Sequence, residues 1–457
     1  MLIRLLQLAV VGAAVALPVT VPGNISTDPK GEKPPEVHLD ELEMRPTEVI
    51  PEHKANQTGD TVDWSVTVLN AEKAWGRGLT GKGVTFCVLD TGIDADHRDV
   101  KDNLIEAKDF TGSRTGTVDV VGHGTHCWGS IAATKNGWGL QGVAYEAKGF
   151  AAKVLGDSGS GSTDRIAAGL RWAKEKKVKV CSMSLGGGGT DPYLPDALAE
   201  LEAAGIIVVA ANGNDSGGPV SYPAAYKQCV AISAVDKAKR LASFSNVGRK
   251  TEAAGPGVAV RSTYPGNRFA DLSGTSMATP NVAGVACLWS QWADEEGLPM
   301  AGRPDKFRKF LEGGCEDLGI PGRDADFGWG LPDCGKIPTK GAPKPPEPPP
   351  GKGGVTFDES DLNEKGLKKL KDAGLDGFLF RLGKAQSADP VAPKITSEEL
   401  TKRVVAGEEL VVAIGVKLDL VKWPNGFELV ETAEQAGVEP GTYKCTKVIR
   451  VRLDKVE

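Results

Sequence analysis

The sequence contains no apolar run long enough to cross a lipid bilayer. The run at residues 5–15 falls short of the about 20 apolar residues that a spanning helix needs, and no later stretch reaches that length either. The chain also lacks an excess of charge of one sign, since 54 Lys and Arg stand against 60 Asp and Glu, a net charge of −6. This balance gives no electrostatic reason to expect binding to nucleic acid or to an anionic membrane. We therefore expect neither nucleic-acid partners nor stable membrane insertion.

A disulfide framework is missing as well. The chain has eight cysteines, but Cys87, Cys181 and Cys287 lie inside apolar runs, where a cysteine is usually a small buried hydrophobe. Cys315 and Cys334 flank a loop rich in glycine and aspartate. They are the one pair that we expect to be bridged, although sequence alone does not determine connectivity.

The composition is that of an ordinary globular protein. Apolar residues make up 40% and charged residues 25% of the chain, which excludes a disordered or fibrous protein. A length of 457 residues predicts two or three domains and allows a large buried core.

The N-terminus has the form of a targeting segment. Arg4 precedes a short apolar run, and Ala14-Val15-Ala16 fits a signal-peptidase site, so residues 1–16 are predicted to be a signal peptide. No cysteine near that site could carry a lipid anchor. We expect a secreted or otherwise extracytoplasmic protein. Residues 17–59 are polar and show no clear periodicity, which predicts a flexible leader or short pro-segment.

Residues 60–338 alternate between two kinds of segment. Short apolar runs predict strands at residues 84–89, 178–185, 206–211 and 230–235. Helices are predicted at residues 123–134, 163–176, 193–204 and 276–292. Continuous apolar strands separated by helices indicate an α/β domain with a mostly parallel central sheet and helices on both faces.

The chain then changes in character. Residues 339–354 are rich in proline and predict an extended linker. Residues 355–457 are expected to form a small α+β domain, with a helix at residues 362–372 and strands at residues 410–416 and 447–453. No chemical motif is found there, and its function is unknown.

Three segments of the α/β domain carry residues suited to nucleophilic catalysis. Asp90 ends a buried strand, His123 opens a helix within Gly-His-Gly-Thr-His, and Ser276 opens another within Gly-Thr-Ser-Met-Ala-Thr-Pro. A serine hydroxyl needs an imidazole to take its proton, and the imidazole needs a carboxylate to orient it. Functional sites in such sheets lie at the carboxyl ends of the strands, which is where Asp90 lies.

Two further features support this interpretation. Pro280 is expected in the first turn of the helix that Ser276 opens, where its missing N–H costs nothing. Asn212 and Asn214 follow the strand at residues 206–211, and an asparagine at a strand end can donate a hydrogen bond to a developing oxyanion.

Each motif alone has an ordinary explanation, such as a turn, a cap or a common loop. Together, in the order Asp90, His123, Ser276, they resemble the subtilisin-like serine proteases (subtilases), and most of all the secreted bacterial subtilisins. The resemblance covers residues 60–335 and includes intervening segments such as CSMSLGGG, SYPAAY and ASFSNVG.

The resemblance implies a role for each matching residue. Ser276 would be the nucleophile, His123 the general base and acid, and Asp90 the orienting carboxylate. Asn214 rather than Asn212 would be the oxyanion donor, together with the backbone N–H of Ser276. Two segments would pair with the substrate main chain, and small residues would line the pocket for the P1 side chain. The first segment is Gly159, Ser160 and Gly161, the second is Ser184, Leu185 and Gly186, and the pocket residues are Ala211, Gly213 and Ser221.

The resemblance also implies a structural calcium ion. Its ligands would be the carboxylate of Asp99, the side chain of Asn136 and three backbone carbonyls, with Asp60 as a further contributor. The carbonyls are those of Thr134, Trp138 and Leu140. Oxygen ligands in this number suit Ca²⁺, and an ordinary glycine-rich turn is the alternative.

The chain departs from the family pattern in a few places. Asn281 stands where the family usually has histidine, and Trp128 is bulky where small residues are usual. The leader is short for the compact pro-domain of the family, so residues 17–59 are expected to be dispensable for inhibition of the mature site, and adding that peptide in trans is expected to leave activity unchanged. Cys127, one turn after His123, matches a cysteine of proteinase K-like members and is expected to be an inert buried residue.

These observations predict a monomeric, secreted serine endopeptidase of broad specificity that acts on polypeptides. The pocket residues are small, so a large uncharged P1 side chain is expected to fit, while Asp215 beside the pocket would tolerate a basic one. Two alternatives stay open: a processing protease with a narrow substrate, and a subtilase fold without activity that serves as a binding module. The complete set of Asp90, His123, Ser276 and Asn214 favours an enzyme.

Overall fold

The computed structural model describes residues 34–39, 45–50, 59–189, 191–339 and 341, and four short strands later in the chain. Contacts divide the chain into two compact units, Met1–Ala342 and Pro343–Glu457. The predicted signal peptide, most of the predicted linker, and the elements predicted at residues 362–372, 410–416 and 447–453 lie outside the described residues.

The second unit is described only in four strands. They form two antiparallel pairs, β15 (Phe380–Arg381) with β16 (Lys394–Ile395) and β17 (Asp419–Trp423) with β18 (Gly426–Val430).

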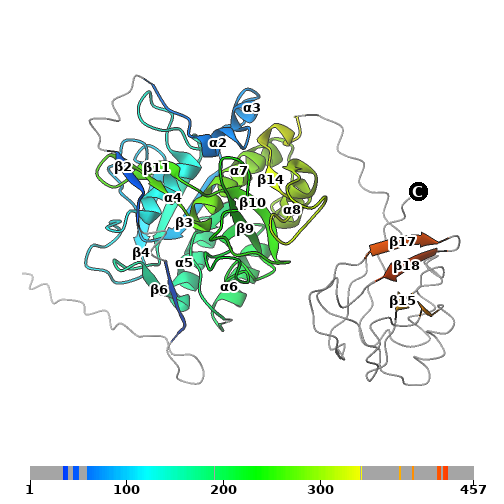
Figure 1. Ribbon diagram of the computed structural model, residues 1–457. Coiled ribbons are helices and arrows are strands. Elements are labelled where there is room, and N and C mark those ends of the chain that lie inside the picture. The colour runs from blue at the N-terminus through cyan, green and yellow to red at the C-terminus, as the bar shows by residue number, and fades with distance from the viewer. Residues whose placement is uncertain are drawn as a thin grey trace, which may run out of the picture. The chain divides into compact units, whose positions relative to one another are not determined.

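The first unit is built around a parallel sheet of seven strands (Figure 1). Their order across the sheet is β10-β9-β8-β7-β3-β5-β4, and every neighbouring pair is parallel. The strands are β3 (Thr85–Asp90), β4 (Leu104–Asp109), β5 (Lys148–Lys153), β7 (Val180–Met183), β8 (Ile207–Ala211), β9 (Cys229–Val235) and β10 (Thr251–Pro256). The inner strands are buried on both faces, which explains their continuous apolar character.

Helices cover both faces of this sheet. On one face, α4 (His123–Ala132) and α7 (Thr275–Glu295) share a core with Trp128 and Trp289. On the other, α5 (Thr163–Glu175) and α6 (Leu194–Ala203) pack in a second core with Leu170 and Leu198. The predicted fold class is therefore confirmed.

The predicted elements agree with the observed ones to within a few residues at each end. Three strands of the sheet were not predicted: β4, β5 and β10. β4 is a partly exposed edge strand, and β5 and β10 are short segments that contain glycine, so none forms a continuous apolar run.

Smaller elements complete the unit. They are α2 (Trp64–Thr67), α3 (Ala71–Trp75), α8 (Arg303–Gly314), the pair β13 (Cys315–Glu316) and β14 (Leu331–Pro332), the 3₁₀ helix η2 (Cys334–Lys336), and the hairpin β11 (Val260–Tyr264) and β12 (Arg268–Leu272). No helix in the described part of the chain is both long and apolar enough to span a membrane.

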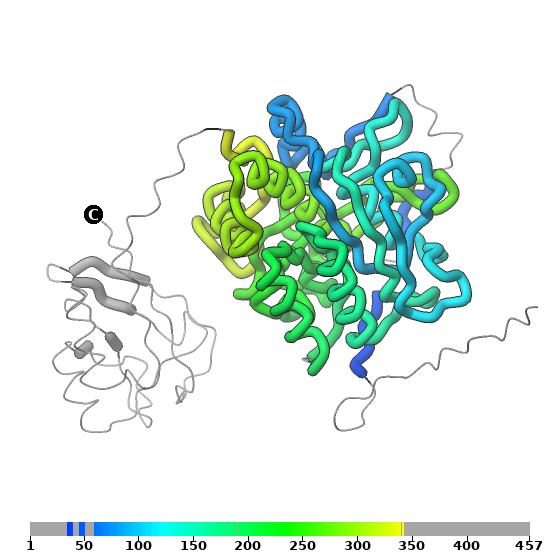
Figure 2. Tube along the Cα trace, turned by 180° about the vertical axis from the view of Figure 1, so that it is seen from behind, coloured from blue at the N-terminus to red at the C-terminus, as the bar shows by residue number. Residues whose placement is uncertain are grey.

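Two segments of the predicted leader form strands on this body. β1 (Glu36–His38) pairs with β6 (Ser160–Ser162), and β2 (Glu48–Ile50) pairs with β12, both antiparallel. In Figure 2, seen from behind, β1 is a dark blue segment that lies against the body. The expectation of a leader without regular structure is therefore wrong for these two segments, which are too short to show a periodic pattern.

The expected disulfide is also wrong. All seven described cysteines are free and buried. Across the β13–β14 pair, Cys315 faces Pro332 rather than Cys334. Cys334 is held elsewhere: its backbone N–H donates to the carbonyl of Leu69, which comes shortly before α3.

The bulky Trp128 is accommodated by a glycine. Its ring packs against Phe86 with centroids 4.6 Å apart, and a Cβ added to Gly149 would come within 2.4 Å of it. Glycine at position 149 therefore provides the space that the unusual tryptophan needs.

We expect Gly149→Ala to destabilise the protein by about 1–3 kcal/mol, because the added methyl group overpacks Trp128 and Phe86. The matched control is Gly313→Ala in α8, where a Cβ meets nothing within 4 Å. This control should be neutral or stabilising by up to about 1 kcal/mol. Denaturant midpoints measure both, and equal midpoints for the two variants would contradict the packing argument.

Candidate active site

Asp90 and His123 form a buried pair at the carboxyl edge of the sheet. Asp90 is the last residue of β3, and His123 is the first residue of α4. His123 Nδ1 donates to Asp90 Oδ1 at 2.7 Å, and the backbone N–H of Thr91 donates to the same oxygen at 2.7 Å. With Nδ1 protonated, Nε2 is the nitrogen that can accept a proton, and it has no hydrogen-bond partner among the described residues.

The environment of His123 sets its charge. Burial lowers the pKa of His123, but the adjacent Asp90 carboxylate opposes this effect and holds the pKa well above its ordinary value of 6.5. Burial and the charge of His123 lower the pKa of the neighbouring His126 to about 4. His126 is therefore neutral at physiological pH, and its Nε2 lies 3.0 Å from the carbonyls of Val260 and Ala270, which ties α4 to the β11–β12 hairpin.

Cys127 lies beneath the pair. Its Sγ is 3.9 Å from His123 Nδ1 and 3.5 Å from the carbonyl oxygen of Ser276. Burial raises the pKa of this thiol to about 11, so it is uncharged at neutral pH. Asp90, His123 and Cys127 are close enough to share a metal ion, but Asp90 Oδ1 and His123 Nδ1 are already bonded to each other.

Ser276 lies in the first turn of α7, and Pro280 explains its surroundings. The helix begins at Thr275, so Pro280 lies inside it, one turn after Ser276, rather than in the first turn as predicted. Because proline has no N–H, the helical bond to the carbonyl of Ser276 is missing. That carbonyl accepts instead from Ser184 Oγ at 2.8 Å and from the thiol of Cys127. The same contacts bring Ser276 into the neighbourhood of His123.

The structure distinguishes the two asparagines. Asn214 Oδ1 accepts from the backbone N–H of Thr275 at 2.9 Å and from its hydroxyl at 3.1 Å, so Nδ2 is the end of the amide not bonded to Thr275. Asn212 is fully buried, and its Nδ2 donates to Asn246 O and to Thr251 Oγ1. Asn214 therefore lies beside the residue that precedes Ser276, while Asn212 supports the loop from inside.

The two predicted substrate-binding segments pair with an extended main chain, and that chain is the protein's own β1. Opposite β6, Val37 faces Gly161 and His38 faces Ser160. On the other side, His38 bridges Gly186 in an antiparallel sense, its N–H 3.4 Å from that carbonyl. The N–H of the next residue, Leu39, donates to the carbonyl of Gly159 at 3.0 Å.

β1 therefore lies between the two segments as the middle strand of three. Its side chains alternate, as in any strand. Val37 and Leu39 are 3% and 5% exposed, while Glu36 and His38 face solvent. The groove thus buries aliphatic side chains at every second position of the strand that occupies it.

A cavity of about 710 Å³ continues from this groove. It reaches from His38 past Ser276 and Asn214 to Ser221. All three predicted pocket residues, Ala211, Gly213 and Ser221, line it. Arg249 and Lys250, which belong to none of the predicted motifs, line it as well.

Asn246 lies in the segment ASFSNVG that contributes to the family resemblance, but no role was predicted for it. Its Nδ2 donates to Asp215 Oδ2 at 2.8 Å and to the carbonyl of Pro219 at 3.0 Å, and lies 3.3 Å from Ser221 Oγ. Its Oδ1 accepts from the backbone N–H of Asp215. Asn246 thereby connects Asp215, Pro219 and Ser221, which all line the cavity. The carboxylate of Asp215 accepts one of these hydrogen bonds. The segments ASFSNVG and SYPAAY were a signal for Asn246 and Ser221, but only the folded loops show that these residues meet.

The five residues predicted to bind calcium lie together where the loop at residues 134–140 packs against Asp99. Asp99 is fully buried, and its carboxylate accepts from Asn136 Nδ2 and from the backbone N–H of Leu140, both at 2.9 Å. The carbonyl of Asp99 accepts from the N–H of Thr134, and the N–H of Trp138 donates to Asn136 Oδ1. Burial, with a contribution from the nearby Asp60 charge, raises the pKa of Asp99 to about 7.

Asn281, which stands where the family usually has histidine, forms a hydrogen bond within its own helix. Asn281 is buried in α7, and its Nδ2 donates to the carbonyl of Met277 one turn earlier at 3.0 Å.

Comparisons with known proteins agree on one family. A sequence model described as the subtilase family matches residues 81–330. The chain is 45% identical to the M-protease of Shouchella clausii over 255 residues, which are 55% of this chain and 66% of that protein. It is 46% identical to Subtilisin Savinase of Lederbergia lenta over 231 residues, or 50% of this chain and 85% of that protein. An alkaline protease of Alkalihalobacillus alcalophilus is 44% identical over 255 residues, again 66% of its length. The match thus spans just under two thirds of the M-protease and the alkaline protease.

Proposed function

Because this chain belongs to the subtilase family, we propose that it is a serine endopeptidase that acts through an acyl-enzyme on Ser276. The observation that carries the proposal is the buried contact of 2.7 Å between His123 Nδ1 and Asp90 Oδ1, with His123 Nε2 left as the acceptor. That arrangement is what a serine nucleophile requires of its base. The predicted signal peptide makes secretion part of the proposal.

The reaction follows from the positions of these groups. His123 Nε2 takes the hydroxyl proton of Ser276 as Oγ attacks the carbonyl carbon of the scissile bond. Asn214 Nδ2 and the backbone N–H of Ser276 stabilise the resulting oxyanion. The intermediate collapses, and the imidazolium gives its proton to the leaving amine. Water then attacks the acyl-enzyme by the reverse sequence of proton transfers, which releases the acid and restores Ser276.

His123 carries a proton twice in this cycle, and Asp90 stabilises the cation each time. In the free protein Ser276 Oγ donates to the carbonyl of Ser184 at 3.2 Å. We expect the contact between Ser276 Oγ and His123 Nε2 to form when substrate binds, because catalytic hydrogen bonds often tighten only then.

The substrate would lie as a strand where β1 lies now. Main-chain pairing with β6 and with Gly186 gives affinity that depends little on side chains, which supports broad specificity. The cavity beyond Ser276 accommodates a large uncharged P1 side chain. The engagement of Asp215 by Asn246 weakens the case for a basic one.

The test is hydrolysis of an unstructured protein such as casein, together with covalent labelling by an organophosphonate. Ser276→Ala should abolish both. Asn214→Ala should lower kcat by about 10²- to 10³-fold with little change in KM, the range known for this donor in subtilisins themselves. Lys309→Ala, at an exposed ion pair on α8, is the control. A folded wild-type protein with an open groove that neither labels nor hydrolyses casein would be a binding module instead.

We propose further that the leader blocks the groove until it is displaced or cut. We expect Val37→Asp combined with Leu39→Asp to raise the initial rate of labelling about tenfold or more, because charges at these two buried positions disfavour the bound strand. Glu36→Gln with His38→Gln changes only the exposed face of the same strand and should leave the rate unchanged. Mass spectrometry must show that the leader is intact in each sample. Equal initial rates in all three intact proteins would refute the block.

The loop at Asp99 fits a calcium ion by residue type, since two carboxylates and an amide meet there, and we propose that it holds one. Asp99, Asn136 and Asp60 would hold it, and it would supply positive charge to a buried carboxylate. In the described arrangement Asn136 presents Nδ2 to Asp99, so ion binding requires its amide to turn.

The predicted result is a pH-dependent calcium effect. The folded pKa of Asp99, about 7, lies above its ordinary value of 3.8, so the folded protein holds a proton that the unfolded chain has lost. Without calcium, this group should lower the free energy of unfolding as pH rises from about 4 to about 7. Calcium should raise the melting temperature above that range.

Asp99→Asn should remove both effects, and Asp96→Asn, at an exposed position nearby, should remove neither. If the wild-type melting temperature at pH 8 is the same in calcium and in chelator, the loop binds no calcium ion. The direct hydrogen bonds to Asp99 then hold the loop by themselves.

A further inference from the structure

Lys153 is a buried cation that the proposed reaction does not use. It is the last residue of β5 and has no exposed surface. In the sheet its Cα partners are Asp90 on β3 and Asp109 on β4, so it lies at the same carboxyl edge as the catalytic pair. Burying an ammonium group is costly unless all its donors are satisfied.

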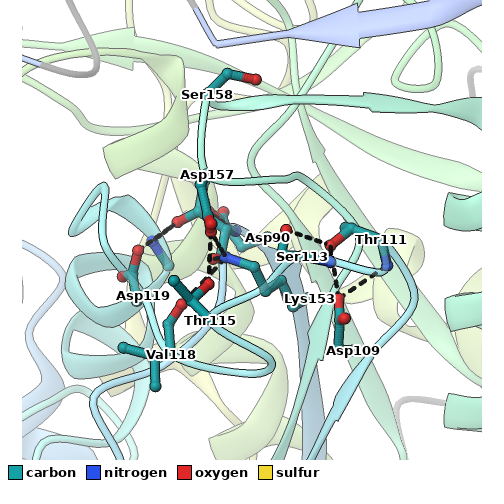
Figure 3. Close-up of polar contacts among 12 residues, drawn as sticks. Asp90, Asp109, Thr111, Ser113, Thr115, Val118, Asp119, Lys153, Asp157 and Ser158 are labelled. Atoms are coloured by element: carbon teal, nitrogen blue, oxygen red, sulfur yellow. Dashed lines mark hydrogen bonds and ion pairs between the residues drawn. The ribbon is translucent and has the colours of Figure 1, made fainter. Parts of the chain in front are cut away.

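Three acceptors surround the ammonium group of Lys153, and they come from three different loops (Figure 3). Nζ donates to the carbonyl of Thr91 and, at 3.1 Å, to the carbonyl of Val118. It also forms an ion pair of 3.0 Å with Asp157. Since an ammonium group has three donors, this set satisfies it completely, and one nitrogen holds the three loops together.

The first loop leads directly to the catalytic pair. The backbone N–H of Thr91 donates to Asp90 Oδ1, the oxygen that also accepts from His123. Thr91 Oγ1 accepts from the backbone N–H of Gly124, in the first turn of α4, at 2.9 Å. The position of Thr91 therefore bears on both members of the pair.

The second loop determines where α4 begins. The helix has no side-chain cap at Gly122, but Asp119, the residue after Val118, accepts from the N–H of Gly122 and from the N–H and hydroxyl of Thr125. Thr91 Oγ1 donates to the same carboxylate at 2.8 Å. Lys153 thus bonds Thr91, one end of the Thr91–Asp119 contact, and Val118, the residue next to the other end.

The third loop leads to the substrate groove. Asp157 Oδ1 also accepts from Thr115 Oγ1 at 2.7 Å. Within its turn, the N–H of Gly156 donates to the carbonyl of Ser160 at 2.7 Å, and Gly159 donates back to Gly156. This turn opens β6 and places the Gly159 carbonyl that pairs with the strand in the groove.

We propose that Lys153 is a positioning residue that aligns the catalytic pair with the substrate-binding strand β6. It touches no reacting atom, and it acts through Thr91 and Val118 on Asp90 and His123, and through Asp157 on β6. The proposal rests on the proposed peptidase activity. It makes a distinctive prediction: the contacts of Lys153 with Thr91 and Val118 should affect kcat, whereas its contact with Asp157 should affect KM.

The experiment compares variants in a chain that carries Val37→Asp and Leu39→Asp, with active sites counted by phosphonate titration. Lys153→Met should lower kcat per titrated site about 10- to 100-fold, since small displacements of catalytic groups have effects of this size. Lys153→Arg keeps the charge and the donors and should retain kcat within about threefold of the parent. Asp157→Ala removes the ion pair with Lys153 and the hydrogen bond from Thr115, but it leaves the bonds of Lys153 to Thr91 and Val118 in place. It should raise KM for extended peptides with kcat unchanged.

Lys179→Met is the matched control. This lysine also bonds one backbone carbonyl, that of Gly83, and one carboxylate, that of Asp294, but it lies at the opposite end of the sheet, before β7. Its loss should lower the melting temperature without changing kcat per titrated site.

Each outcome decides the question. If the parent chain with Val37→Asp and Leu39→Asp is inactive, the proposed peptidase function is overturned, and the inference about Lys153, which rests on it, is overturned as well. If the parent chain is active and Lys153→Met has the same kcat per titrated site as the parent, the inference is overturned, even if fewer molecules of the variant fold. If Lys153→Met does not fold, Asp157→Ala decides, and an unchanged KM there overturns the inference.

Discussion

The carbonyl oxygen of Ser276 is the point on which the arrangement of the site depends. Pro280 removes its helical partner, and a side chain from the loop after β7 and one from α4 take that place. A buried carbonyl without a partner is costly, so Ser184 and Cys127 are held where Ser276 is. Because the helical hydrogen bond to this carbonyl is missing, Cys127 can donate to it and so connects Ser276 to the helix that His123 opens.

The other half of the site is held by buried charge. The helix that begins at His123 has glycine at its N-cap and no acidic residue in its first turn. Asp119, from the preceding loop, supplies the acceptors that the free N–H groups need. Lys153 lies on the same group of loops with the opposite charge. Asp119 and Lys153 thus bind the loops around Asp90 and His123 from outside that pair.

The leader is the clearest case in which tertiary structure changes the interpretation. β1 has only three residues, too few to show alternation, and the polar, proline-containing sequence around it predicts no regular structure. The groove provides the missing partners, because β6 and Gly186 offer main-chain groups on both sides. A segment can thus be a strand only because another part of the chain has open edges to pair with.

By itself the sequence determined the α/β fold and the burial of cysteines such as Cys87. It also determined that Asp90 lies at the end of a strand and that His123 and Ser276 lie at the starts of helices. These follow from local pattern, since apolar runs, helix starts and motif order are all properties of neighbouring residues. Tertiary structure alone decided that Cys315 faces Pro332, that Asn246 ties walls of the cavity together and that Lys153 meets Thr91 and Val118. The physical reason is that each of these contacts joins residues far apart in the chain, and no local pattern encodes the distance between loops that meet only in the folded protein.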